Sequence, residues 1–249
     1  WEERRGILSF TVAAVFGGLT AASLFCDVFG EEERARAYRK AASEIRDGAS
    51  KHLWREDLGR FCRMLSRGRG GTLEVDGTCD SSLWGLFAFG VYKPDDPRIA
   101  ATMAVLRERL WVGGVTGGMA RYEHDDYHRV GREVTGNPWF IATLWLAEYL
   151  LNVAETRDQL REVEKILLWA CDHTLPSGVM AEQIHPHTGE PLSVSPLTWS
   201  HATFVSTTQR YAGRLAEIES GAPYPRHEDW IGRMFTEACS AIHGSCKVK

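Results

Sequence analysis

The sequence lacks most of the short motifs that assign a function from residue spacing alone. None of its 6 cysteines forms a CxxC pair, so we expect neither a zinc ribbon nor a dithiol redox site. It has no convincing Ser-His-Asp arrangement and no glycine-rich phosphate loop. It also lacks a long basic run, and its formal net charge of -4 argues against nucleic acid or an anionic membrane surface as a partner.

Signals for targeting are equally scarce. No signal peptide or transmembrane span is recognisable, because glycines and threonines interrupt the apolar stretch from Phe10 to Phe29 and acidic residues follow it. We therefore expect a buried helix there. The chain begins with Trp1 rather than Met, so we expect the natural N-terminus to lie upstream and leave the location open. The irregular cysteine spacing favours reduced thiols and the cytoplasm, with Cys62 and Cys79 as the one pair to test for a disulfide.

The sequence does contain helical segments that alternate between two types. Nearly all-round apolar segments occupy residues 8–29, 80–91, 139–153 and 197–216. Ser195 as the cap and Pro196 in the first turn indicate the start of the last of these helices. Charged, amphipathic segments occupy residues 31–52, 95–111 and 157–173, and a final helix is predicted at 227–243.

Pairing an apolar with an amphipathic helix predicts an inner and an outer layer. Apart from one small hairpin at residues 58–78, with Gly-Arg-Gly-Gly at its turn, there is almost no strand signal. We predict an all-α ring or solenoid of about eight helices, without a fixed-period repeat.

Two long polar loops precede inner helices, at residues 117–136 and 177–194, and the second contains Glu182. If the inner helices run side by side in one direction, both loops meet the N-terminal Trp1-Glu2-Glu3 at one end, which we call the mouth. Such an acidic mouth lined by aromatic rings suits a sugar. Aromatic faces stack on pyranose rings, and carboxylates or arginine bind the hydroxyls.

Several motifs in these segments resemble one known family. They are WEERRGILSF at residues 1–10, GGMARYEHDDY at 117–127, GNPWFIATLWLAEYL at 136–150, LPSGVMAEQ at 175–183 and TGEPLSVSPLTWSHATFV at 188–205. Together they resemble the inverting glycosidases of glycoside hydrolase family 15, which includes glucoamylases, glucodextranases and some trehalases. The resemblance implies an (α/α)6 barrel. Residues 1–249 would form a single partial barrel domain, without the N-terminal half and without the Arg-Asp pair that the family uses early in its barrel.

The resemblance also implies roles for individual residues. Glu2 matches the general acid and Glu182 the general base. The residues implied to bind substrate are Trp1, Glu3, Arg121, Asp125, Tyr127, Trp139 and Trp199. Arg121 and Asp125 would grip the terminal glucose, and the tryptophans would form the aromatic wall of the pocket.

The chemistry implied is inverting hydrolysis, which uses two carboxyl groups about 6.5–9.5 Å apart with one water between them. Burial and the neighbouring Glu3 would raise the pKa of Glu2, so that it could donate a proton. Glu182, near a helix N-terminus, would stay ionised and activate the water. We therefore expect an exo-acting enzyme that releases glucose from the non-reducing ends of α-1,4- or α-1,6-linked glucans.

Alternatives remain open at this point. The chain could be a non-catalytic or incomplete carbohydrate-binding fragment, a trehalase of the same family, or another (α/α)-barrel enzyme such as a sugar epimerase. The paired carboxylate motifs count against the epimerase. An open half-barrel would expose apolar helix flanks, so we expect a complementary chain or self-association at its open edge.

No cofactor and no metal site is predicted. His185 and His187 form an HxH pair, and His124, Asp125, Asp126 and His128 are clustered, but no spacing supplies a complete ligand set. We interpret these histidines as solvated loop residues, and the expected partner is an α-glucan oligosaccharide or polysaccharide.

Overall fold

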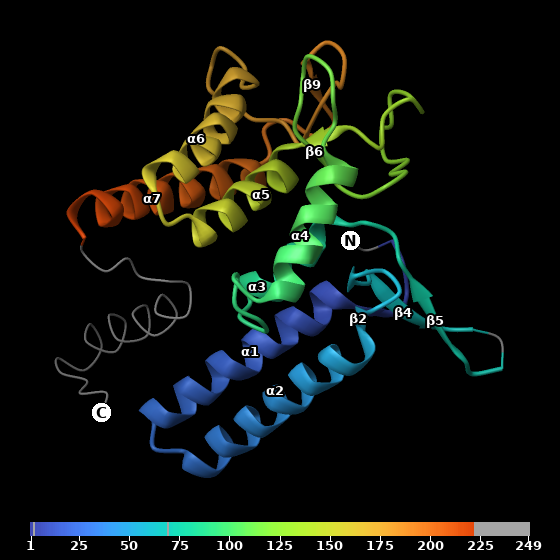
Figure 1. The fold of residues 1–249 in the computed structure, drawn as a ribbon, viewed down its shortest axis with the longest axis vertical. Helices are drawn as coiled ribbons and strands as arrows, with labels where there is room; N and C mark the ends of the chain where they lie inside the picture. Colours follow the sequence, from blue (N-terminus) through green and yellow to red (C-terminus); the bar gives the residue numbers. More distant parts are fainter. Residues whose placement is uncertain (2, 69, 222–249) are drawn as a thin grey trace.

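The computed structural model describes residues 1, 3–68 and 70–221. Glu2 and the predicted last helix at 227–243 lie outside these residues. The helices are α1 (Ser9–Val28), α2 (Glu32–His52), the 3-10 helix η1 (Ser81–Trp84), α3 (Gly85–Ala88), α4 (Pro97–Leu110), α5 (Phe140–Val153), α6 (Arg157–Asp172) and α7 (Thr198–Ser220). The described part is thus an all-α assembly of inner and outer helices, as predicted (Figure 1).

The layers follow from the apolar periodicity of the helices. In the inner row, α1 packs on η1 and α3, η1 packs on α5, and α5 packs on α7. The outer helices α2, α4 and α6 each pack on a member of this row (Figure 1). On α6 the buried residues recur at helical spacing, at Leu160, Val163, Ile166, Leu167 and Ala170.

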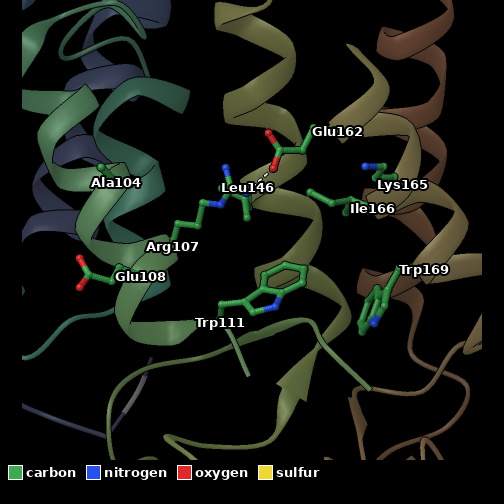
Figure 2. Close-up of a pocket in the computed structure, with 9 residues that line it drawn as sticks. All are labelled: Ala104, Arg107, Glu108, Trp111, Leu146, Glu162, Lys165, Ile166 and Trp169. Carbon is green, nitrogen blue, oxygen red and sulfur yellow. Dashed lines mark hydrogen bonds and ion pairs between the residues drawn. The ribbon is translucent and has the colours of Figure 1, made fainter. Parts of the chain in front are cut away.

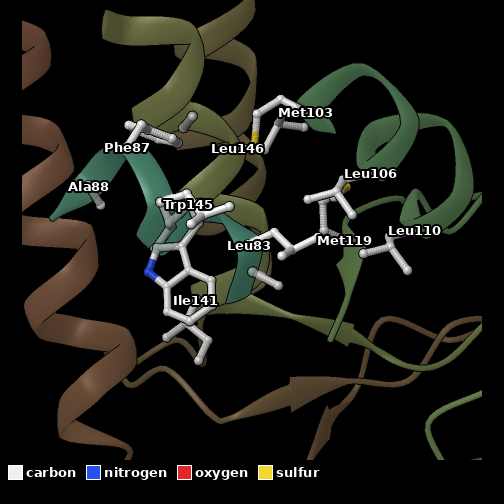
Figure 3. Packing of buried hydrophobic residues seen from close by; sticks show 14 of the residues in the cluster. Leu83, Phe87, Ala88, Met103, Leu106, Leu110, Met119, Ile141, Trp145 and Leu146 are labelled. Carbon is white, nitrogen blue, oxygen red and sulfur yellow. The ribbon is translucent and has the colours of Figure 1, made fainter. Parts of the chain in front are cut away.

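Helix α5 is the centre of the core. It is buried all round except near its C-terminal end, because α4, α6, α7 and η1 surround it. Trp145 and Leu146 on α5 meet Leu83 of η1, Phe87 of α3 and Met103 of α4 in one apolar cluster (Figure 3). Burial of side chains this large is the main favourable term in folding.

Helix α1 differs from the prediction of a buried helix. By length and composition it could cross a membrane, and only 28% of its most apolar window is buried. Ala13 and Phe16 face protein, whereas Val15 and Phe25 are 48% and 51% exposed. The reason is its place at the end of the inner row, where α2 and α3 cover one side only. An apolar composition does not tell how many neighbours a helix has.

Two other helix boundaries were predicted wrongly. The segment at 80–91 forms only the short η1 and α3, and Gly90 has a φ of 78°. Helix α7 begins at Thr198, without a side-chain cap from Ser195. Leu197 is extended and its N–H donates to the carbonyl of Met180, 3.0 Å away, so the chain turns into the helix only after it. The sequence around Pro97 offers Asp95 or Asp96 as the cap of α4, and the structure selects Asp96, which accepts from the N–H of Arg98 at 2.8 Å.

The predicted hairpin is present, but it is not the only β structure. The strands are β1 (Ile7–Leu8), β2 (Trp54–Arg55), β3 (Arg60–Phe61), β4 (Met64–Arg67), β5 (Leu73–Asp76), β6 (Met119–Ala120), β7 (Pro138–Trp139), β8 (Gln183–Ile184) and β9 (Pro191–Leu192). The predicted hairpin is β4–β5, and β1 pairs with β4. Each of the other strands has two residues, too few for an alternating pattern in the sequence.

The suggested Cys62–Cys79 disulfide is not formed. Both thiols are free and buried. Burial raises the pKa of each to about 11, so both stay protonated and unreactive.

Candidate active site

A sheet of four short antiparallel strands, in the order β6-β7-β8-β9, assembles the mouth from the two polar loops. Met119 pairs with Trp139, and Trp139 pairs with Gln183. Arg121 directly follows β6, and Glu182 directly precedes β8. The sheet therefore holds residues that are about sixty positions apart in the chain in one structure, with β7 between β6 and β8.

Arg121 is the centre of the site. It is 5% exposed, and its Nε and Nη2 donate to the two carboxylate oxygens of Asp125, each at 2.7 Å. Asp125 is 1% exposed and also accepts from the N–H of Tyr127 at 3.0 Å. Burial alone would lower the pKa of Arg121, but the hydrogen bonds and charge of Asp125 outweigh it and raise that pKa. The guanidinium is thus held in one orientation by a bidentate pair.

Glu3 completes this ion pair from the N-terminal segment. Its carboxylate accepts from Nη2 of Arg121 at 2.5 Å and from the hydroxyl of Tyr122 at 2.6 Å. Burial acts to raise the pKa of Glu3, but the bond from Tyr122 and the charge of Arg121 outweigh it, so the pKa is lowered. Glu3 is therefore an ionised hydrogen-bond acceptor that is still partly open to solvent.

Aromatic rings cover the arginine. Its guanidinium carbon lies 5.0 Å from the ring of Trp1, 4.8 Å from that of Trp139 and 5.2 Å from that of Tyr127. Trp1 also meets Trp199, with ring centroids 6.2 Å apart. Trp139 is buried, whereas Tyr127 and Trp199 are 42% and 45% exposed and so present ring surface to a ligand.

Glu182 directly precedes β8 of the same sheet and lies beside the start of α7. Its carboxylate accepts from the hydroxyl of Ser193, and its N–H donates to the carbonyl of Val194 at 2.9 Å. The hydroxyl of Ser200, in the first turn of α7, donates to the carbonyl of Ala181 at 2.8 Å. The expected proximity of Glu182 to a helix N-terminus is therefore present in the structure.

The structure thus brings together seven of the predicted residues. They are Trp1, Glu3, Arg121, Asp125, Tyr127, Trp139 and Trp199, joined by the contacts above. Glu182 is connected to this set because Gln183, the residue after it, pairs with Trp139 across β7 and β8. Glu2 lies outside the described residues. The roles assigned to these residues remain predictions.

Sequence reasoning missed the residues that position this set. Asp80 is fully buried and accepts from the indole N–H of Trp1 at 2.9 Å and from the N–H of Ser82 at 2.9 Å. Asn137 donates to Gln183 at 2.8 Å and so ties the two polar loops together. An Asp followed by Ser-Ser is a capping signal, which could have located Asp80, but its contact with Trp1 has no local signal.

The histidine-rich loops show no metal site. Among the residues that the structure describes, no group of three His, Cys, Asp or Glu side chains could hold a metal ion. His187 instead pairs with Glu133, with Nε2 and Oε1 2.7 Å apart, and this contact links the two polar loops at the surface.

Comparison with known proteins agrees with this geometry. The family model for glycosyl hydrolases family 15 matches residues 1–168 and 152–209. An uncharacterized glycosyl hydrolase of Methanocaldococcus jannaschii is 29% identical over 82% of this chain and 32% of its own length. A glucoamylase of a Clostridium species is 27% identical over 82% of this chain and 32% of its own length. A trehalase of Mycobacterium tuberculosis is 26% identical over 90% of this chain and 31% of its own length.

The fold comparison points the same way. A bacterial glucoamylase solved in complex with acarbose superposes with a TM-score of 0.71 at 22% identity, over 94% of this chain and 36% of that one. At this identity the likeness shows the (α/α)6-barrel fold alone. The chain spans about a third of the length of the curated relatives named here. With a family model matching most of its residues, the chain belongs to the glycosyl hydrolases of family 15.

Proposed function

We propose that the protein of which this chain forms part is an inverting, exo-acting hydrolase that releases glucose from the non-reducing ends of α-glucans. The observation that carries this proposal is Arg121, held between Glu3 and Asp125 beneath aromatic rings. A buried arginine of fixed orientation flanked by carboxylates offers donors and acceptors for sugar hydroxyls. The exposed rings of Tyr127 and Trp199 offer the apolar faces on which a pyranose stacks.

The two carboxylates have different proposed roles. Glu2 is the acid that protonates the glycosidic oxygen, and Glu182 is the base that takes a proton from the attacking water. Support for the acid comes from Glu3, whose lowered pKa keeps a negative charge beside Glu2. A negative charge close to an acid disfavours loss of its proton, which is the condition that the proposed acid requires.

Support for the base comes from the surroundings of Glu182. The Ser193 hydroxyl donates to its carboxylate and fixes the direction of the acceptor oxygen. The first turn of α7 also holds this segment, because the Ser200 hydroxyl donates to the carbonyl of Ala181, the residue before Glu182. One water between this carboxylate and the anomeric carbon would attack the face opposite to the leaving group. The first product would then be β-glucose.

A trehalase is the second candidate, and the trehalase of Mycobacterium tuberculosis among the relatives favours it. The third candidate is an incomplete, sugar-binding part of such an enzyme, because the chain spans only a third of its relatives' length.

The test is glucose release from maltose, isomaltose, panose, soluble starch and trehalose, with proton NMR to identify the first anomer. The 249-residue chain is assayed, together with any longer protein that contains it. We expect β-glucose as the first product of the active enzyme, and a loss of at least about a thousandfold in Glu182→Gln. Release of α-glucose, or full activity in Glu182→Gln, would refute the mechanism. Release from trehalose alone would select the trehalase.

A further inference from the structure

A groove on the outer face of the molecule, away from the residues assigned above, has the features of a second binding site. It measures about 620 Å³ and lies between the outer helices α4 and α6, with α5 beneath it (Figure 2). Its lining residues are Ala104, Arg107, Glu108, Trp111, Leu146, Glu162, Lys165, Ile166 and Trp169.

Two tryptophans converge at one end of this groove. A Cβ placed on Gly117 would lie 3.3 Å from the ring of Trp111 and 3.8 Å from that of Trp169, so both indoles border the same glycine. Trp169 is fixed, since its N–H donates to the carbonyl of Thr116 at 2.7 Å. Trp111 is 39% exposed, and its indole N–H has no hydrogen-bond partner among the described residues. One ring is therefore anchored, and the other presents a face and a donor to a ligand.

The charges of the groove are balanced. Arg107 reaches across from α4 and pairs with Glu162 on α6, as Figure 2 shows. The other two charged lining residues are Glu108 and Lys165, again one of each sign. A net charge of zero favours neither an anion nor a cation, and four charged groups around the rim disfavour a fully apolar chain. A neutral ligand with many hydroxyls and flat apolar faces satisfies both conditions.

We propose that this groove is a second sugar-binding site that holds an internal segment of an α-glucan. The choice of α-glucan among sugars rests on the proposed function, whereas the site itself does not. Gly117 and Gly118 border the groove, and strand β6 leads from them directly to Arg121. A polysaccharide held there would raise the local concentration of chain ends near the mouth.

The probe is β-cyclodextrin, a closed ring of α-1,4-linked glucose. It has no non-reducing end, so an exo-acting pocket cannot take it as a substrate end. Binding to the 249-residue chain is measured by calorimetry and by tryptophan fluorescence. We expect a millimolar dissociation constant, and weakening by about tenfold in Trp111→Ala, since an exposed aromatic platform dominates such a contact.

The matched controls are Leu168→Ala and Trp199→Ala. Leu168 is an exposed apolar residue of α6 outside the groove, and Trp199 is the exposed indole at the mouth. Both variants should bind the probe as the parent chain does. Absence of binding at about 10 mM, or weakening by Trp199→Ala instead of Trp111→Ala, would overturn the proposal.

If circular dichroism shows that Trp111→Ala does not fold, two other variants test whether the groove binds the probe. Trp111→Phe keeps part of the platform and should bind with intermediate affinity, and Lys165→Ala should weaken binding a few-fold. Unchanged binding in both would refute the site. A change in oligomeric state without a change in sugar binding would instead show that the groove is an interface between copies. Glucose release is measured separately, so failure of the hydrolase proposal is distinguishable from failure of this one.

Discussion

Asp80 shows how a single buried residue holds the candidate site together. Its Oδ1 accepts from the indole of Trp1 and from the N–H of Ser82, while its Oδ2 lies 3.8 Å from the guanidinium of Arg63. Ser81 next to it donates its N–H to the carbonyl of Arg121 at 2.9 Å. Burial raises the pKa of Asp80, although the hydrogen bonds and Arg63 act in the opposite direction. Asp80 therefore links the N-terminal segment to the arginine of the site.

Replacing Asp80 should separate its hydrogen bonds from its charge. Asp80→Ala leaves two buried donors without an acceptor and should lower the free energy of unfolding by about 2 kcal/mol. Asp80→Asn keeps the Oδ1 acceptor and should lose less than about 1 kcal/mol. Urea unfolding gives these values, and near-ultraviolet circular dichroism reports whether Trp1 keeps its environment. Equal losses of unfolding free energy in both variants would mean that the charge of Asp80, rather than its hydrogen bond to Trp1, stabilises the fold.

At the scale of elements, the site depends on the close approach of β6 to α6. Gly118 has a φ of 88°, and a Cβ there would lie 2.6 Å from the ring of Trp169 and 3.0 Å from Pro138. Only glycine fits this backbone conformation and this space. The approach fixes β6, and Arg121 directly follows β6 in the chain.

The variant Gly118→Ala should therefore lose roughly 3 kcal/mol of unfolding free energy, through backbone strain and overpacking. Gly113→Ala is the control in the same loop, because its Cβ would meet nothing within 4 Å. That control should stay within about 0.5 kcal/mol of the parent chain. Thermal and urea unfolding of the two variants would check the difference. A stable Gly118→Ala would show that the loop relaxes away from Trp169.

At the scale of the whole molecule, the inner helices form a row with two ends. Helix α1 lies at one end and α7 at the other, and the ring is incomplete in the described residues (Figure 1). Val15 and Phe25 on one face of α1 are about half exposed. An exposed apolar face of this kind favours association with another surface.

We therefore expect copies of this chain to associate through α1. Size-exclusion chromatography with light scattering should show oligomers or aggregates at micromolar concentration. The double variant Val15→Lys, Phe25→Lys should shift the population toward monomer by about tenfold or more in dissociation constant. Leu73→Lys changes an equally exposed apolar residue on the β4–β5 hairpin and should have no such effect. A clean monomer of the parent chain would contradict this prediction.

Local periodicity was enough to locate the long helices and the apolar face of the amphipathic ones, because both depend only on residues close together in the chain. The amphipathic α2 and α6, the cap Asp96 and the β4–β5 hairpin were all predictable on this basis. The convergence of Glu3, Arg121, Asp125 and Trp139 was expected from the motifs of the family, without knowledge of the contacts that join them.

Tertiary structure alone decided the rest. The two-residue strands β6 to β9 have no local pattern, since their pairing joins loops far apart in the chain. The bond of Asp80 to Trp1 and the groove between α4 and α6 likewise depend on how separate helices pack. The exposure of α1 and the burial of α5 could not be told apart from their sequences, because burial depends on the number of neighbours, and composition does not record it.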